Sequence, residues 1–218
     1  MISVADLLAD DRLPGNYFSK DLYIKGTLEL GLLENRRGDR LLALPNALLE
    51  SIVQGLNNET GQATRFVLRN CGLWWGKNFY ARFCEELSEY YGKSVADLSM
   101  VEFTQALKEC WRTHGWGNFH LNTSYQSYGY LVVEIQNSPF TAHSLQPNQP
   151  SGALEAGVLQ AFFKQLTGRE LACEQTSCES LGAERNCFVL ALENRLRAVE
   201  ALVQEGQSHD AIMQILTQ

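Results

Sequence analysis

Two spacings of apolar residues along the chain predict helices in some segments and strands in others. Between residues 61 and 91 the apolar positions recur every three or four residues, which predicts one long helix. These positions are Val67, Cys71, Trp74, Trp75, Phe79, Phe83, Leu87 and Tyr90. A second helix should begin after Ser99, because Ser99 and Glu102 match a capping box, and it should end at residues 114–115.

Shorter apolar runs bounded by turn residues predict strands. They cover residues 28–33, 40–44, 116–123, 128–136, 170–177 and 187–192. The first two runs flank a polar turn and predict a hairpin near the N-terminus. The third and fourth predict a strand pair in which Phe119 and Leu121 share one face and His120 lies on the other.

Further helices complete the predicted order of elements. They cover residues 45–55, 152–166, 195–204 and 210–216. Ser151 should cap the helix 152–166, and Gly168 should end it. Residues 143–150 are polar and contain two prolines, so they are the best linker candidate. The pattern predicts a single α+β domain over residues 1–218, with an antiparallel sheet packed against helices and extra helices at the C-terminus.

Gly72 and Gly76 lie one turn apart inside the long predicted helix. Each glycine within a helix costs about 1 kcal/mol relative to alanine. We therefore expect another element or a ligand to approach the helix closely at these positions.

Charge and hydropathy exclude several classes of partner. The 218-residue chain has a formal net charge of −7 at pH 7, and its densest basic run is only Arg36, Arg37 and Arg40. Nucleic-acid binding needs a clustered basic surface, so no nucleic-acid partner is expected. The chain has no run of 18 apolar residues that would predict a transmembrane segment, and its acidic N-terminus does not match a secretory signal. We expect a cytoplasmic protein, with any membrane contact made through a partner.

The aromatic residues form a candidate ligand-binding set. A pocket for a flat ligand could be lined by Trp74, Trp75, Phe79, Phe83, Trp111, Trp116 and Phe119, with His120 beside them. The alternative is that aromatics at helical spacing form an ordinary core. His120 could bind a haem iron or a chlorin magnesium, and the alternative is a strand histidine that faces solvent.

Cysteines near the C-terminal end form a candidate metal site. The chain has six cysteines, which in a cytosolic protein indicate metal binding, redox chemistry or burial rather than disulfides. Thiolates and carboxylates bind zinc, and the candidate ligands are Cys173, Glu174, Cys178 and Cys187. Their spacing is not that of a zinc finger or ribbon, so packed, reduced thiols are the alternative.

The same segment resembles the V4R (4-vinyl reductase) domain family. An acidic residue, Cys178, Gly182 and the Cys187-Phe188 pair are similar to that family's closing motif. Upstream, Gly72-Leu73-Trp74-Trp75-Gly76 and Gly115-Trp116-Gly117-Asn118-Phe119 are similar to its glycine-marked helix and its turn into a strand. The resemblance covers residues 16–192, with the cysteine motif at 170–192 and a helical extension at 193–218.

The resemblance implies a fold related to haem-based nitric-oxide sensor domains and to vesicle-tethering (TRAPP-type) subunits. It also implies a hydrophobic cavity between helices and sheet, and in some relatives a structural zinc. Relatives include sensory domains for aromatic effectors and accessory proteins of chlorophyll-type pigment synthesis. The cofactors it implies are therefore zinc and a tetrapyrrole.

Three functions compete at this point. The first is a carrier, sensor or assembly factor that binds a tetrapyrrole (a bilin or chlorin) or another aromatic ligand, in photosynthetic pigment or photosystem biogenesis. The second is a dimeric scaffold without a ligand, which uses the fold to form a homodimer or to bind a protein partner. The third is an enzyme that acts on a divinyl chlorophyll precursor. The chain has neither a glycine-rich nucleotide fingerprint nor a Ser-His-Asp arrangement, so an enzyme is the least favoured and no catalytic residue is assigned.

Overall fold

The computed structural model describes residues 15–141 and 149–218 of the chain. The acidic N-terminal segment and most of the predicted linker 143–150 lie outside the described residues. In the described part, none of the helices combines the length and the apolar character that a membrane crossing requires.

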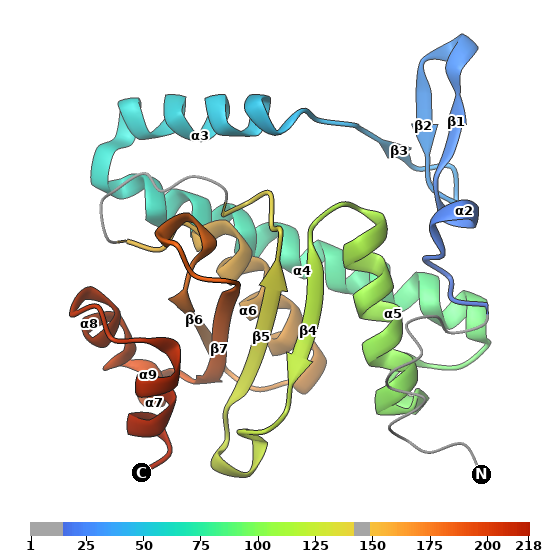
Figure 1. Cartoon of the computed structure of the whole chain (residues 1–218). Helices are drawn as coiled ribbons and strands as arrows, with labels where there is room; N and C mark the ends of the chain where they lie inside the picture. Colours follow the sequence, from blue (N-terminus) through green and yellow to red (C-terminus); the bar gives the residue numbers. More distant parts are fainter. Residues whose placement is uncertain (1–14, 142–148) are drawn as a thin grey trace.

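A four-stranded antiparallel sheet forms the centre of the molecule (Figure 1). In spatial order its strands are β4 (Asn118–Asn122), β5 (Leu131–Gln136), β7 (Asn186–Leu192) and β6 (Leu171–Ser177). The predicted pairing of the strands around residues 116–136 is confirmed, because Phe119 lies opposite Ile135. β7 is apolar at nearly every position because it is buried on both faces, as expected for a central strand with layers on either side.

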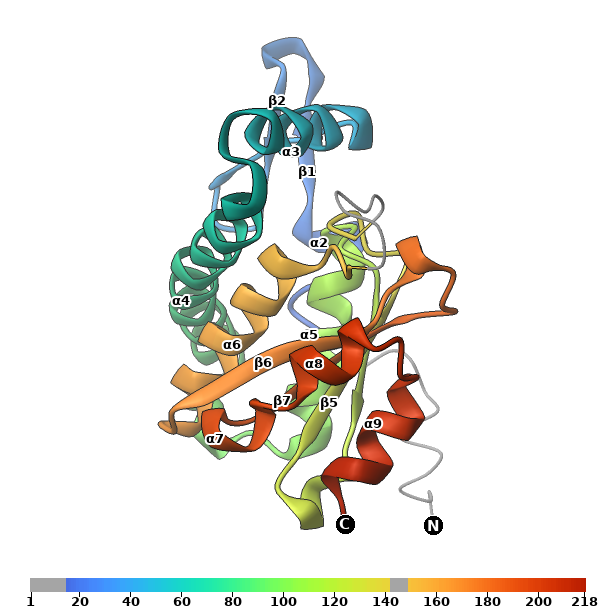
Figure 2. The same ribbon diagram turned by 90° about the vertical axis from the view of Figure 1, so that its left-hand side faces the viewer.

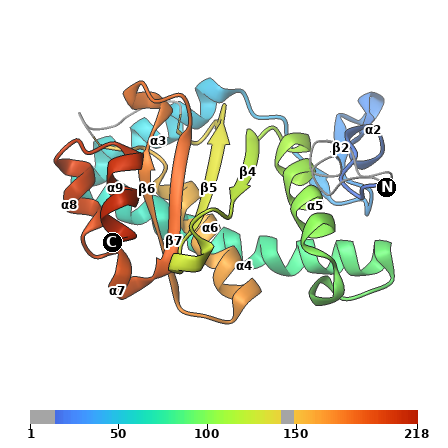
Figure 3. The ribbon, with the colours of Figure 1, turned by 60° about the horizontal axis from the view of Figure 1, so that its bottom comes forward.

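Three helices cover one face of the sheet: α4 (Thr64–Tyr91), α5 (Met100–Thr113) and α6 (Ala153–Thr167). The helices α7 (Glu193–Leu196), α8 (Val199–Gln204) and α9 (His209–Leu216) cover the other face (Figure 2). Where the sequence predicted one helix over residues 195–204, the structure has the two short helices α7 and α8. Viewed from below, the row of strands runs from β6, beside the C-terminal helices, to β4, beside α5 (Figure 3). This arrangement confirms the predicted α+β class.

Glycines allow α4 and α6 to approach each other closely. A Cβ atom built on Gly72 would lie 2.0 Å from the Leu154 carbonyl oxygen, and one on Gly76 would lie 2.5 Å from the Val158 carbonyl oxygen. From the α6 side, a Cβ on Gly157 would lie 2.3 Å from the Arg69 carbonyl oxygen. The two backbones are in direct contact, so the expected close approach at Gly72 and Gly76 is confirmed, and the approaching element is α6.

The predicted helix ends are mostly confirmed. Ser99 and Glu102 form a complete capping box at the start of α5, and Gly168 ends α6 in the left-handed conformation. The prediction for Ser151 was wrong: the N-cap residue of α6 is Gly152, and no side chain caps the helix. Since the Ser151 hydroxyl donates to the Thr141 carbonyl oxygen at 3.0 Å, it holds a neighbouring loop instead.

The N-terminal elements extend away from the central sheet (Figures 1 and 3). They are α2 (Lys20–Tyr23), β1 (Lys25–Thr27), β2 (Leu32–Glu34), β3 (Arg40–Leu41) and α3 (Asn46–Thr60). The predicted hairpin is confirmed at β2 and β3, where Leu33 lies opposite Leu41, whereas Leu28–Leu30 forms a short 3-10 turn rather than a strand. α3 contains no buried residue.

Candidate functional site

An aromatic cluster lies between the sheet and the helices α4, α5 and α6. It consists of Trp75, Phe79, Phe83, Trp111, Trp116, Phe119 and Phe162. Ring centroids of neighbours lie 5.0 Å apart for Trp75 and Trp116, 5.5 Å for Phe79 and Trp111, and 5.0 Å for Trp111 and Phe119. Most of these pairs are tilted or edge-to-face, the arrangements that aromatic rings favour.

Six of the eight predicted ligand-binding residues belong to this cluster, and two do not. Trp74 is 76% exposed on the outer side of α4. Adjacent helical residues point about 100° apart, so when Trp75 faces the interior Trp74 cannot. His120 lies on the exposed side of β4 and lines a separate shallow hollow with Lys108 and Arg112. The prediction that Trp74 lines the pocket is therefore wrong, and His120 matches the alternative to a ligand, a strand histidine that faces outward.

Sequence analysis missed a histidine and a phenylalanine that complete the cluster. The His114 ring stacks on the Trp116 ring with centroids 4.4 Å apart, and burial lowers the pKa of His114. Phe162 of α6 contacts Phe79 at 5.4 Å between centroids. Phe162 belongs to an apolar run in which every face of the helix is buried, so its spacing alone did not distinguish it.

Glu155, in the first turn of α6, places a carboxyl group beside the aromatic cluster. The residue is only 1% exposed, and its Oε2 accepts a hydrogen bond from the Ser138 hydroxyl at 2.9 Å. Burial raises the pKa of Glu155 to about 8, although the Ser138 hydroxyl and the Trp111 indole lower that pKa in part. A buried carboxyl group in an otherwise apolar helix face requires a physical explanation.

Two buried polar atoms at this position have no hydrogen-bond partner: the Glu155 Oε1 and the Trp111 Nε1. The indole is close enough to influence the carboxyl group, but the two atoms do not form a hydrogen bond of acceptable geometry. Each buried polar group left unpaired costs about 1–3 kcal/mol. Sequence analysis did not single out Glu155, because an acidic residue in the first turn of a helix is usually an exposed partner of the helix dipole.

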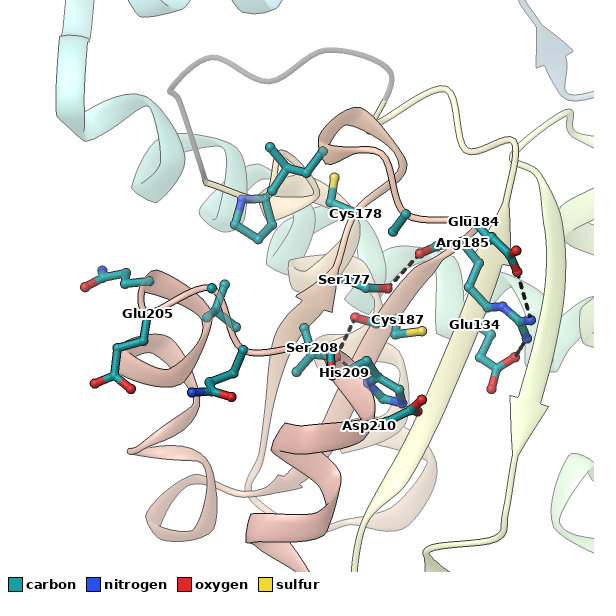
Figure 4. A pocket seen from close by; sticks show the side chains of 18 of the residues that line it. Glu134, Ser177, Cys178, Glu184, Arg185, Cys187, Glu205, Ser208, His209 and Asp210 are labelled. Atoms are coloured by element: carbon teal, nitrogen blue, oxygen red, sulfur yellow. Dashed lines mark hydrogen bonds and ion pairs between the residues drawn. The ribbon is translucent and has the colours of Figure 1, made fainter.

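A larger hollow lies on the face of the sheet opposite the aromatic cluster (Figure 4). This open cleft of about 900 Å³ lies between the cysteine-containing loop, the end of β6, the start of β7 and the start of α9. Polar side chains line part of its walls: Arg185 pairs with Glu134 at 2.6 Å, and a His209 ring nitrogen lies 2.7 Å from the Thr176 hydroxyl. Burial raises the pKa of the Cys187 thiol at the cleft wall, so this thiol is neutral at pH 7.

The structure separates the four predicted zinc ligands. Cys173 packs on the helix-covered face of the sheet beneath α4 and α6, whereas Cys187 packs on the opposite face against α9. Glu174 forms ion pairs with Arg69 at 3.0 Å and Arg65 at 3.7 Å. Among the described residues, no group of three or more His, Cys, Asp or Glu side chains is placed to hold a metal ion. These residues do not fit a zinc site, and all six cysteines are free thiols.

Residues 131–192 match the family model of the V4R domain. This segment is similar to a V4R domain. It contains β5, α6, β6, β7 and the cysteine-containing loop, and therefore both Glu155 and the wall of the cleft. The V4R resemblance expected from the sequence is confirmed. Comparison with curated proteins gives no match.

Solved structures share this fold at low sequence identity. The phenol-responsive sensory domain of the transcription activator PoxR, solved with phenol, matches 100% of this chain and 98% of its own length, with 11% identity and a TM-score of 0.62. A trafficking protein particle complex subunit 3 from Naegleria fowleri, covalently bound to palmitic acid, matches 68% of this chain and 92% of its own, with 13% identity and a TM-score of 0.52. A vinyl-4-reductase family protein from Methanocaldococcus jannaschii matches 69% and 82%, with 15% identity and a TM-score of 0.43. The first two establish the fold relationship.

Side-chain hydrogen bonds hold the cysteine-containing loop. Gln175 accepts from the Gly152 amide at 2.7 Å and donates to the Asn186 side-chain oxygen at 3.3 Å. Asn186 donates in turn to Glu179 at 2.6 Å. Cys178 lies within 3.4 Å of the Ser151 hydroxyl, at the start of α6. Side-chain amides and hydroxyls therefore connect this loop to α6, at the position where we expected a metal.

Proposed function

We propose that this protein is a small-molecule-binding sensor or carrier whose ligand is a small aromatic compound held among α4, α5, α6 and the sheet. The observation that carries the proposal is the pair of buried, unpartnered polar atoms, the Trp111 Nε1 and the Glu155 Oε1, beside the aromatic cluster. An ordinary core packs rings together and satisfies its buried polar groups. A ligand with a ring and a polar group accounts for both features.

The fold relationship supports this ligand class. The PoxR sensory domain, which aligns along the whole chain, is solved with phenol, a single aromatic ring with one hydroxyl group. Ligand sites of this type are mostly apolar and contain a few polar groups that fix the orientation of the ligand. The aromatic cluster with Trp111 and Glu155 has this composition.

A tetrapyrrole is the larger ligand class that the V4R resemblance implies. It fits the interior less well, because neighbouring rings of the aromatic cluster already lie 5.0–5.5 Å apart. We therefore place a single-ring ligand ahead of a bilin or chlorin, and ahead of a role in photosynthetic pigment biogenesis.

Thermal unfolding in the presence of ligands tests the proposal. Phenol, cresols and toluene should raise the unfolding temperature in a concentration-dependent manner, since a ligand at 100 times its Kd stabilises the folded state by about 2.7 kcal/mol. Cyclohexanol is the control for non-specific hydrophobic stabilisation. An absorption spectrum of the freshly isolated protein tests the larger ligand, because a tetrapyrrole gives a visible band. If no aromatic compound shifts the unfolding temperature, the proposal is wrong.

The exposed apolar residues of α3 and α4 support a homodimer as a second function. Leu44, just before α3, and Ile52 within it are 57% and 56% exposed, and Phe66 and Trp74 on the outer side of α4 are 68% and 76% exposed. Large apolar side chains that are exposed together on neighbouring helices are candidates for a protein–protein interface. We infer that a second copy of the chain covers these residues, with α3 of each protomer packed against α4 of its partner. In a twofold dimer this contact occurs two times, so the exposed residues of α3 and α4 are covered in both protomers.

The dimer is tested by light scattering on size-exclusion fractions. The wild-type protein should have the mass of two chains, and Ile52→Glu and Trp74→Glu should each shift it to the mass of one. Ile215→Glu is the matched control, because Ile215 on α9 is 47% exposed but lies outside the proposed interface. A monomeric wild type, or a dimer unaffected by both substitutions, would exclude this interface.

A further inference from the structure

The Trp111 indole has a fixed orientation in the interior. Its ring contacts those of Phe79, Trp116 and Phe119, with centroids 5.0–5.5 Å apart, and the residue is 2% exposed. Trp111 is also anchored in the last turn of α5. Because three rings enclose the indole, its N–H cannot turn toward solvent, and it remains without a partner.

Glu155 has one oxygen atom engaged and one available. Its Oε2 accepts from the Ser138 hydroxyl, and Ser138 in turn lies in the loop that follows β5. That single bond is sufficient for a structural role of connecting α6 to the loop. The Oε1 has no such role, and it lies beside the Trp111 indole.

We propose that Trp111 and Glu155 are the polar anchor of the ligand, and that they select a neutral aromatic hydroxyl group. This inference depends on the proposed function, because it names the chemistry of the same interior site. The hydroxyl oxygen accepts from the indole N–H, and the Glu155 carboxyl group, which is neutral at pH 7 because burial raises its pKa to about 8, forms a second hydrogen bond with the same hydroxyl group through its Oε1. A plain hydrocarbon ring leaves both atoms unpaired. A carboxylate ligand would bury an uncompensated negative charge in this apolar interior, next to the acidic Glu155.

The electrostatic surroundings of Glu155 support a neutral ligand. The groups that influence its pKa are the Ser138 hydroxyl, the Trp111 indole and the acidic Glu179, in addition to burial. The Cys173 thiol on β6 is also influenced by Glu155, and burial raises the pKa of that thiol. Arg69 acts on Cys173, but no cation is among the groups that shift the pKa of Glu155, so none acts directly on this carboxyl group to compensate an anionic ligand.

Isothermal titration calorimetry at pH 7 with phenol, toluene and benzoate tests the anchor. The wild-type protein should bind phenol at least tenfold more tightly than toluene, and benzoate more weakly than either. Trp111→Phe and Glu155→Leu should each weaken phenol binding about tenfold, because each removes one hydrogen bond worth about 1–1.5 kcal/mol, and should leave toluene binding unchanged. Each variant removes one of the two proposed anchor groups, so the proposed anchor can still be tested with the other variant if one of them fails to fold.

Tyr91→Phe is the matched control. The Tyr91 hydroxyl is also buried without a partner, but it lies at the far end of α4, outside the aromatic cluster, so its removal should not change phenol affinity. If the wild type binds neither phenol nor toluene, the proposed function is wrong. If it binds both equally, or if both variants retain the preference for phenol, the function stands and the anchor is wrong.

Discussion

Substitution of Gly72 by alanine tests the contact between α4 and α6 that positions the aromatic cluster. The new Cβ would lie 2.0 Å from the Leu154 carbonyl oxygen and 3.0 Å from the Gly157 Cα, both of them backbone atoms. A side chain could move away, but here the two helices themselves must separate. Overpacking of a core typically costs about 1–3 kcal/mol, and we expect the upper part of that range.

Alanine also gains helix propensity, which offsets about 1 kcal/mol of this loss. The net destabilisation should therefore be about 2 kcal/mol, or about 4–8 °C in the unfolding temperature of a domain of this size. Urea denaturation followed by tryptophan fluorescence measures it.

Gly55→Ala is the matched control for this experiment. Gly55 lies within α3, and no atom lies within 4 Å of a Cβ added to it. Alanine at this position should therefore change only the helix propensity and should stabilise the protein by about 1 kcal/mol. If Gly72→Ala is as stable as the wild type, or resembles Gly55→Ala, the close backbone packing of α4 and α6 is refuted.

Two further predictions follow from buried polar groups. The pKa of Glu155 is raised from 4.5 to about 8, so the unfolded chain loses this proton before the folded one does, and the folded state loses stability as the pH rises from about 5 to 8. Glu155→Gln has no group that titrates at this position. The free energy of unfolding of the variant should therefore rise relative to that of the wild type across this pH range, by roughly 4 kcal/mol at most. If the two free energies change in parallel from pH 5 to 9, the raised pKa of Glu155 is contradicted. In the cysteine-containing loop, EDTA should leave the unfolding midpoint unchanged, whereas Asn186→Ala should lower stability by about 1–3 kcal/mol because it leaves buried partners unpaired. A drop in the midpoint with EDTA would show that a metal holds the loop.

Local patterns were sufficient to predict most elements of the fold. The long helix expected at residues 61–91 is a short 3-10 turn followed by α4, and the capping box at Ser99 is present. These features depend on neighbours within a few residues, so their signal is contained in the sequence. The glycines in α4 also indicated a close contact, although the sequence could not identify α6 as the partner.

The candidate site was harder to predict because its features depend on contacts between residues that lie far apart in the sequence. Periodicity identified the aromatic residues, but the doubled Trp74 and Trp75 left open which ring faces inward. Glu155 becomes noteworthy only when Trp111, from a different helix, is seen to lie beside it without a hydrogen bond. The cysteines were grouped by their spacing along the chain. Successive residues of a strand point to opposite faces, and the fold places Cys173 on β6 and Cys187 on β7 on different sides of the sheet.

A crystal structure of the protein grown with phenol tests the central claim most directly. The account predicts one phenol molecule in the interior, with its oxygen about 2.7–3.2 Å from both the Trp111 Nε1 and the Glu155 Oε1, and with its ring against the aromatic cluster. Phenol bound only in the cleft beside His209, or an interior that stays closed at saturating phenol, would contradict it.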